Sequence, residues 1–154
     1  MPADLPYRAL LRALRGQGSV ETEDFLVLAA NDWDPTYRCT ALGSLGWWEP
    51  YRPAATLACL QQARRDPSPE VRQCARAALA RLGERAALQW FRTALTGEET
   101  QHIFEAIQLA ASEGLTLLWP DLDRLTEADD AEVAHHAREA LERLCEDMDH
   151  RRGR

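Results

Sequence analysis

The sequence of 154 residues contains no lysine, so arginine supplies all 18 of its basic side chains. Aspartate and glutamate together number 25, and the formal net charge is -7. Proteins that bind the phosphate backbone of DNA or RNA normally present a basic surface. The shortage of positive charge therefore disfavours nucleic acid as the partner of this protein.

Long apolar runs are also missing. No stretch reaches the roughly 18 consecutive apolar residues that a membrane-spanning helix needs. The first residues lack the basic segment and the apolar core of a secretory signal. We therefore expect a soluble protein of the cytoplasm that makes no membrane contact.

The sequence contains four cysteines, but their spacing is not that of a disulfide-rich or zinc-binding protein. No two of the four cysteines have the CxxC spacing of a zinc knuckle, and all four lie inside predicted helices. We therefore expect four free thiols in a reducing compartment. The residues concerned are Cys39, Cys59, Cys74 and Cys145.

Recognisable motifs for catalysis or metal binding are missing as well. Two histidines share one helical face for a metal when they stand four residues apart, and no two of the four histidines do so. Ser44 lies in the run Leu42-Gly43-Ser44-Leu45-Gly46, but the spacing is not that of a nucleophile elbow and no strand precedes it. No glycine-rich phosphate loop occurs. We expect a protein that is not an enzyme and that uses no metal or cofactor.

The clearest feature that is present is a helix signal over Asp66–Gly83. Ser68 is placed to cap the first turn, Pro69 fits the first helical position, and Gly83 suits the end. Between them, apolar residues recur at the spacing of one helical face. These residues are Val71, Ala75, Ala78, Leu79 and Leu82.

This pattern returns along the chain. One copy begins earlier, at Asp32, and another begins later, at Asp130, while a weaker copy follows the first signal directly and ends at Gly114. We interpret the chain as an N-terminal helix over residues 5–15 followed by four helix pairs. Such pairs bury a continuous core only by stacking on their neighbours. The sequence therefore predicts an all-α, right-handed solenoid, with one domain over residues 1–148 and a disordered tail over residues 149–154.

The repeated pattern resembles the HEAT repeat, above all the short bacterial type also found in phycobiliprotein lyase subunits. The residues that carry the resemblance are Asp66, Val71, Arg72, Ala75, Ala78, Leu79, Leu82 and Gly83. The resemblance implies a ladder between neighbouring repeats in which Asp32, Arg38, Asp66 and Arg72 have structural roles. Ile103 and Ala134 stand where the later arginines would be, so we expect the ladder to stop after the second copy.

Two adjacent tryptophans, Trp47 and Trp48, stand at the end of a predicted helix. A helix cannot direct neighbouring side chains into one core, so one of them is a candidate anchor for a partner protein. The alternative is that both pack under the following turn at Pro50 and Tyr51.

The repeat offsets align positions of the second helices into rows. One row contains Gln73, Phe104 and His135, and the next contains Arg76, Ile107 and Arg138. Concave faces of solenoids are their usual binding surfaces. We therefore predict a non-catalytic scaffold that binds a protein or peptide on these residues. The resemblance to lyase subunits implies an alternative, which is an accessory role toward a bilin.

Overall fold

The computed structural model describes residues 9–11 and 13–153, and the regular elements in this part of the chain are helices. The expected N-terminal helix over residues 5–15 is helical at 9–11 and 13, and its other positions before residue 14 lie outside the described residues. The elements that follow are η1 (Leu14–Gly16), α2 (Val20–Ala29), α3 (Pro35–Ser44), α4 (Pro53–Ala63), α5 (Pro69–Arg81), α6 (Arg85–Leu95), α7 (Thr100–Ser112), η2 (Thr116–Leu118), α8 (Trp119–Leu125) and α9 (Ala131–Arg152).

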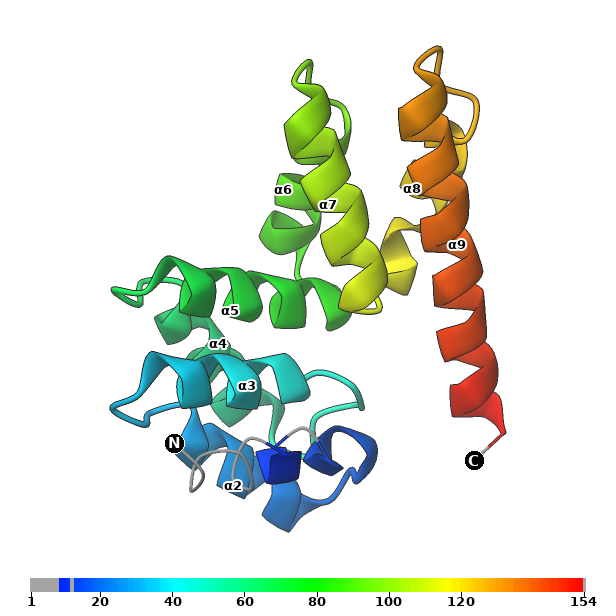
Figure 1. Cartoon of the computed structure of the whole chain (residues 1–154). Helices are drawn as coiled ribbons and strands as arrows, with labels where there is room; N and C mark the ends of the chain where they lie inside the picture. The colour runs from blue at the N-terminus through cyan, green and yellow to red at the C-terminus, as the bar shows by residue number, and fades with distance from the viewer. Residues whose placement is uncertain (1–8, 12, 154) are drawn as a thin grey trace. The chain divides into compact units, whose positions relative to one another are not determined.

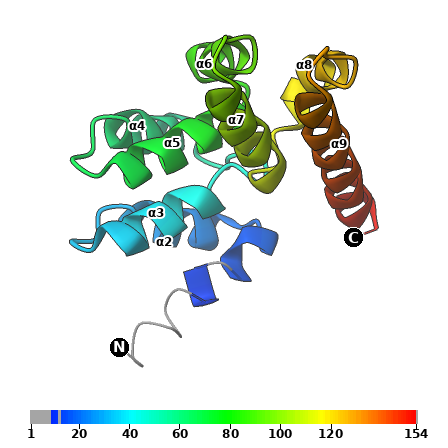
Figure 2. The ribbon, with the colours of Figure 1, turned by 45° about the horizontal axis from the view of Figure 1, so that its top comes forward.

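These helices form four consecutive pairs, α2 with α3, α4 with α5, α6 with α7 and α8 with α9. Second helices of neighbouring pairs also pack on each other, α3 on α5 and α7 on α9 (Figure 1 and Figure 2). The prediction of an all-α solenoid of helix pairs is confirmed. By compactness the chain divides into two units, Met1–Leu82 and Gly83–Arg154, each with two pairs, whereas the sequence predicts one domain over residues 1–148.

Helix starts follow the capping residues of the sequence. The Ser68 side chain accepts a hydrogen bond from the amide of Val71 at the start of α5, and Asp130 accepts bonds from the amides of Glu132 and Val133 at the start of α9. Ser19 caps α2 in the same way. Because these signals are local, they fix the helix boundaries without knowledge of the packing.

Helix ends use glycine in the left-handed conformation. Gly46, Gly83 and Gly114 follow α3, α5 and α7 with φ values of 83°, 81° and 64°. A residue without a Cβ atom adopts this conformation at little cost and closes the last turn. At Gly46 a Cβ atom would also come within 3.1 Å of the Ala78 carbonyl oxygen, so packing and backbone both require glycine there.

The last helix is longer than expected. The sequence predicts a disordered tail from residue 149, but α9 continues through Arg152, so that prediction is wrong for residues 149–152. No helix breaker occurs before Gly153, and Arg152 brings positive charge to the negative end of the helix dipole. Pro120 occupies the first turn of α8, where a proline has no intrahelical hydrogen bond to lose.

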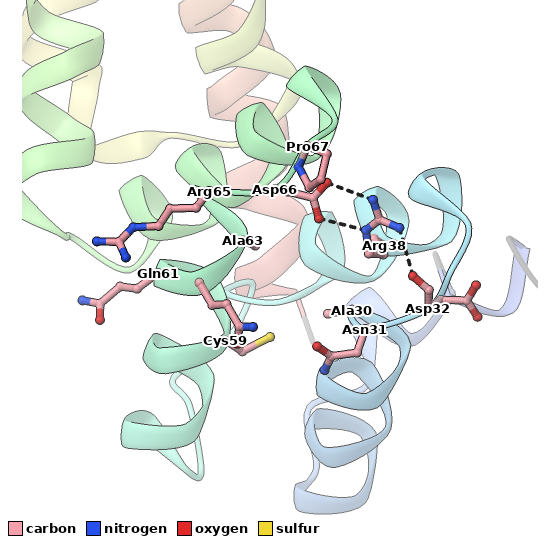
Figure 3. Close-up of a pocket in the computed structure, with 11 residues that line it drawn as sticks. Ala30, Asn31, Asp32, Arg38, Cys59, Gln61, Ala63, Arg65, Asp66 and Pro67 are labelled. Atoms are coloured by element: carbon pink, nitrogen blue, oxygen red, sulfur yellow. Dashed lines mark hydrogen bonds and ion pairs between the residues drawn. The ribbon is translucent and has the colours of Figure 1, made fainter.

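In the first unit, Arg38 joins the turns of the two helix pairs (Figure 3). Its Nε and Nη2 atoms each lie 2.9 Å from a carboxylate oxygen of Asp66, and Nη1 donates to the carbonyl of Asp32 at 3.0 Å. The side chains of Arg38 and Asp66 are only 16% and 12% exposed. The ladder implied by the repeat resemblance is therefore present at this step. Arg72 donates to the carbonyls of Asp66 and Pro67, in the turn of its own pair.

A buried carboxylate holds the loop between α3 and α4. Glu23 on α2 is 1% exposed, and it accepts hydrogen bonds from the Tyr51 amide at 2.8 Å, the Arg52 amide at 2.9 Å and the Thr56 hydroxyl at 2.8 Å. Burial acts to raise the pKa of Glu23, but these bonds, together with one from the Trp48 indole, hold its pKa below the usual value. Glu23 is therefore an anion in the folded protein at neutral pH.

The second unit has its own core and its own ion pair. Phe91 and Leu95 of α6, Leu122 of α8 and Leu144 of α9 are buried. Arg92 on α6 reaches Asp121 on α8, with Nε 3.2 Å from Oδ2, and Arg124 contacts the same carboxylate at 2.6 Å. This pair connects the first helices of adjacent repeats, at a position for which the repeat pattern makes no prediction.

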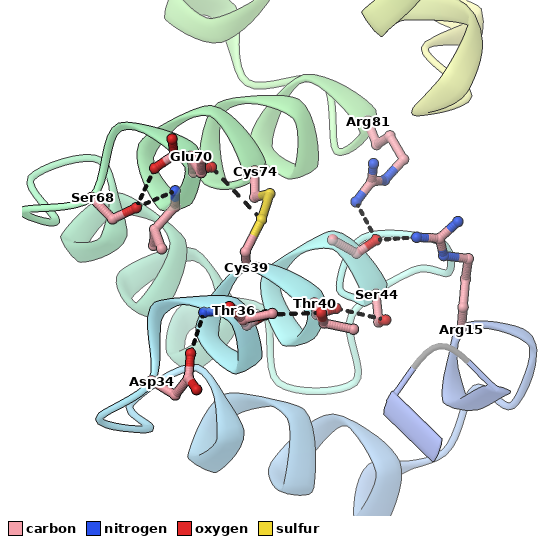
Figure 4. Close-up of a disulfide and its surroundings, with 12 residues drawn as sticks. Arg15, Asp34, Thr36, Cys39, Thr40, Ser44, Ser68, Glu70, Cys74 and Arg81 are labelled. Atoms are coloured by element: carbon pink, nitrogen blue, oxygen red, sulfur yellow. Dashed lines mark hydrogen bonds between the residues drawn. A yellow bond between two sulfur atoms is a disulfide. The ribbon is translucent and has the colours of Figure 1, made fainter. Parts of the chain in front are cut away.

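Two of the four cysteines are bonded. Cys39 on α3 and Cys74 on α5 form a disulfide, with their Cα atoms 5.6 Å apart (Figure 4), while Cys59 and Cys145 are free. The expectation of four free thiols is therefore wrong for this pair. The repeat offset aligns Cys39 with Gln73. In the structure, the stacking of α3 on α5 brings Cys39 to the following residue, Cys74, instead.

Candidate protein-binding surface

The exposed side of α3 and α5 forms one candidate surface in the first unit. Gln73 is exposed, as predicted, and Arg76 is half-buried one turn further along α5. Burial of the Arg76 guanidinium, and the nearby charges of Arg64 and Arg72, lower its pKa from the usual value. The surface is small and polar. Its other exposed or half-exposed residues are Thr36, Cys39 and Thr40 on α3 and Glu70 and Cys74 on α5.

Trp47 is half-buried and is held on three sides. Its indole Nε1 donates to the Gly43 carbonyl at 2.8 Å, and the guanidinium carbons of Arg15 and Arg81 lie 4.6 Å and 4.8 Å from the ring centroid. Arg15 and Arg81 also donate to the same carbonyl of Gly43. Trp47 therefore connects three segments, the N-terminal segment, α3 and α5, through the cation–π contacts of its ring and the hydrogen bond of its indole nitrogen.

Trp48 is also half-buried, and it packs on different residues from Trp47. Its ring covers Gly18, where a Cβ atom would meet the Trp48 Cγ atom at 3.1 Å. Its indole bonds to the buried Glu23. The two tryptophans therefore divide between two packing sites, and the turn at Pro50 and Tyr51 is held by Glu23 as well.

A cavity of about 390 Å³ lies beside the tryptophans. Its walls are formed by the end of α3, the following loop, the start of α4 and the end of α5. The lining residues are Gly46, Trp47, Trp48, Glu49, Pro50, Pro53, Leu57, Arg81 and Leu82. The lining combines aromatic and proline side chains with two charged side chains, those of Glu49 and Arg81.

A larger hollow of about 810 Å³ opens between the ends of α2 and α4, beside the pair of Arg38 and Asp66 (Figure 3). Cys59 lines it, and burial raises the pKa of this thiol, so at neutral pH it is protonated and a poor nucleophile. Hydrogen bonds from Arg38 lower the pKa of Asp66 and keep it ionised. Arg38 and Asp66 support the turns, and Cys59 is not activated as a nucleophile.

Trp33 is the most exposed large apolar side chain among the described residues, at 87%. It lies in the turn between α2 and α3, where its carbonyl accepts a bond from Arg38. The sequence assigned the anchor role to Trp47 and Trp48, but the structure exposes Trp33 more than either. Trp33 stands between Asp32 and Asp34, the N-cap of α3, and therefore lies outside the helical faces. That position in the sequence was the signal that could have predicted its exposure.

In the second unit, α7 and α9 bring an aromatic pair to the surface. Phe104 is half-buried, and its ring centroid lies 4.8 Å from that of His136, with the planes at 67°. Glu139 approaches both histidines, with 3.4 Å to Nε2 of His135 and 3.5 Å to Nδ1 of His136. The predicted neighbour of Phe104 was His135, so the contact is again displaced by one residue. We call the exposed surface around this pair the α7–α9 face; it comprises Gln101, Phe104, Glu105, Gln108, His135, His136, Glu139 and Glu142.

The second predicted row does not form a surface in this unit. Ile107 is 1% exposed and belongs to the core, so the predicted apolar contact at this position is wrong. Arg138 is exposed, but its Nη2 atom donates to the Thr126 carbonyl at 2.8 Å. Arg138 therefore connects α9 to the preceding loop.

Charge is distributed unevenly along the chain. The first unit has 10 arginines and 9 acidic residues, which give +1, and the second has 8 arginines and 16 acidic residues, which give -8. Three of these carboxylates, those of Glu105, Glu139 and Glu142, lie on the α7–α9 face. These exposed carboxylates give the face negative charge.

Residues 9–11 and 13–153 contain no cluster of three or more His, Cys, Asp or Glu side chains arranged to hold a metal ion. Within the same described ranges, the helices are too short or too polar to cross a membrane.

Comparison with known protein families finds HEAT repeats over residues 22–112, which is more than half of the chain and covers α2 to α7. The match does not distinguish the phycobiliprotein lyase type. No curated protein matches the chain at the significance required. The repeat match agrees with the stacked helix pairs and with the ion pair of Arg38 and Asp66 between them. The chain belongs to the HEAT-repeat family.

Proposed function

We propose that this protein is a non-catalytic interaction module and that its α7–α9 face binds a basic segment of a partner protein. HEAT repeats commonly mediate contacts between proteins. Their preformed helical surfaces bind with little loss of backbone entropy, because the helices are already ordered.

The observation that carries the proposal is the aromatic pair of Phe104 and His136, which stands at the surface among the carboxylates of Glu105 and Glu139. Interfaces draw most of their affinity from a few aromatic or arginine anchors. A half-buried ring offers an apolar contact, and the carboxylates around it attract arginine or lysine. A segment with basic and apolar residues on one side matches both features.

The test uses a labelled helical peptide of arginine and leucine as the probe, and a peptide with glutamate in place of arginine as its control. Fluorescence anisotropy of the probe is followed as the full chain is added. We expect the arginine peptide to bind and the glutamate peptide not to bind. Affinity should fall as salt is raised, because exposed charges are screened within about 8 Å at physiological ionic strength.

A matched pair of variants locates the contact. Glu139→Gln and Asp123→Asn each remove one exposed negative charge from the second unit, but Asp123 lies on α8, outside the α7–α9 face. We expect Glu139→Gln to weaken binding by about three- to tenfold, as for one charge-assisted contact, and Asp123→Asn to have little effect. Equal losses in both variants would mean that only the overall charge attracts the probe, and tighter binding of the glutamate peptide would refute the proposal.

A further inference from the structure

Cys39 and Cys74 face each other across the seam between α3 and α5 (Figure 4). Their Cα atoms are 5.6 Å apart, within the range that a disulfide needs without backbone movement. Both residues are half-exposed, so small molecules can reach the sulfur atoms from solvent. The pair is a surface link and no part of the core.

The seam is held together without this link. Ala41 and Leu42 on α3 and Ala75 and Leu79 on α5 are fully buried. The ion pair of Arg38 and Asp66 joins the same two repeats, and Arg81 of α5 donates to two carbonyls at the end of α3. Because apolar packing and these polar contacts hold α3 against α5, we expect the first unit to fold without the disulfide.

We infer that Cys39 and Cys74 form a reversible thiol–disulfide site, which locks the second helices of the first two repeats together when it is oxidised. The oxidant we name is a small disulfide of the glutathione class. One cysteine thiolate attacks a sulfur of that disulfide, giving a mixed disulfide and one departing thiolate. The second cysteine thiolate then attacks the protein sulfur, closes the bond and releases the second thiolate.

The atoms and electrons of this exchange balance. Two protein thiols lose two electrons and two protons to become one disulfide, and the small disulfide gains them to become two thiols. Reduction by the same thiols runs the steps backward. The site therefore needs no bound metal or cofactor.

The link would change how far α3 and α5 can move apart. It closes a segment that includes all of α4, and it lies next to Gln73 on the exposed side of α5. Oxidation removes the freedom of the two helices to slide or separate at this point, while reduction restores it. The two remaining cysteines serve as internal references, because neither has a bonded partner.

The experiment equilibrates the full chain with mixtures of reduced and oxidised glutathione, stops exchange with acid, unfolds the protein and alkylates every free thiol. Unfolding ensures that the half-buried Cys59 is counted. Intact mass should change in one step from four tags in reducing mixtures to two tags in oxidising ones, with peptide mapping assigning the change to Cys39 and Cys74. The Cys59→Ser variant should change from three tags to one. The Cys39→Ser variant should form no bond within the protein, so any tag that Cys74 loses in oxidising mixtures should be replaced by the mass of one bound glutathione.

Two further measurements separate a switch from a fixed structural link. Circular dichroism should show the same helix content in both states, and amide hydrogen exchange should become faster in α3 and α5 on reduction, with α7 and α9 unchanged. Four tags in the most oxidising mixture would overturn the inference. So would a bond that survives the most reducing mixture in the folded protein, or loss of helix content on reduction.

Discussion

Replacing Glu23 with glutamine tests whether its buried carboxylate fixes the loop that carries Trp47 and Trp48. One carboxylate oxygen accepts from the Arg52 amide and the Thr56 hydroxyl, and the other accepts from the Tyr51 amide. Glutamine retains one oxygen, so its amide nitrogen must face one of these donors. A hydrogen bond to a charged group contributes about 1.5–3 kcal/mol, and the retained bonds lose their charge, so we expect Glu23→Gln to lower the free energy of unfolding by about 2–3 kcal/mol.

The effect should depend on pH in a defined direction. Hydrogen bonds hold the pKa of Glu23 below that of an unfolded glutamate, which is about 4.3. The contribution of the ionised carboxylate is therefore complete above the unfolded pKa and is lost as pH falls through the lower, folded pKa. The difference in stability between the wild type and Glu23→Gln should be constant from about pH 7 to about pH 5.5 and should shrink below about pH 4.

Urea unfolding followed by circular dichroism measures this difference at each pH. Glu21→Gln is the control, because Glu21 lies on the same helix and is exposed. Surface changes of this kind alter stability by no more than about 0.5 kcal/mol. A Glu23→Gln variant as stable as the wild type at neutral pH, or a difference that persists unchanged in acid, would refute the role given to this carboxylate.

Three other predictions concern packing and ion pairs. Arg38→Ala should lower the free energy of unfolding in urea by about 2 kcal/mol, because it removes the arginine that pairs with Asp66 at a partly exposed site. Adding Asp66→Asn to this variant should recover part of the loss, which a double-mutant cycle measures. Ile107→Ala should lower the free energy of unfolding by about 3 kcal/mol, because Ile107 is a core residue. Phe104→Ala should lower it by less than the roughly 3–5 kcal/mol that is typical of a core phenylalanine, because Phe104 is half-buried. Gly46→Ala should lower the melting temperature by several degrees, because about 1 kcal/mol or more of backbone strain adds to the close approach of the Ala78 carbonyl.

Helix boundaries were predictable because their causes are local. The signal expected over Asp66–Gly83 corresponds to α5, which covers Pro69–Arg81. A cap such as Ser68, a proline at a first position and a glycine such as Gly83 each act within one turn. No tertiary contact is needed to interpret them.

Contacts between repeats were displaced from the prediction by one residue. The offsets align Cys39 with Gln73 and Phe104 with His135, but the structure pairs these residues with Cys74 and His136. Sequence repetition identifies equivalent positions, whereas neighbouring helices touch where their surfaces meet. The crossing of two helices makes those points differ, and this shift is not encoded in the repeat length.

Burial was predicted poorly where one helix contacts two others. α7 packs on both α6 and α9, so its buried side is wider than a single stripe and includes Ile107 beside Ala106 and Ala110. Glu23 gave no signal either. An acidic residue in the first turn of a helix is normally explained by the helix dipole, and its burial here depends on the loop between α3 and α4, which is distant in the sequence.

The position of Trp47 makes it a natural optical probe of the first unit. Its ring contacts guanidinium groups from two distant segments, Arg15 of the N-terminal turn and Arg81 of α5. Indole emission responds to the charges and the water near the ring. Release of either arginine would therefore be visible as a change of emission wavelength or intensity, without any added label. Because four other tryptophans also emit, a Trp33→Phe background would remove one exposed contribution and make changes at Trp47 easier to follow.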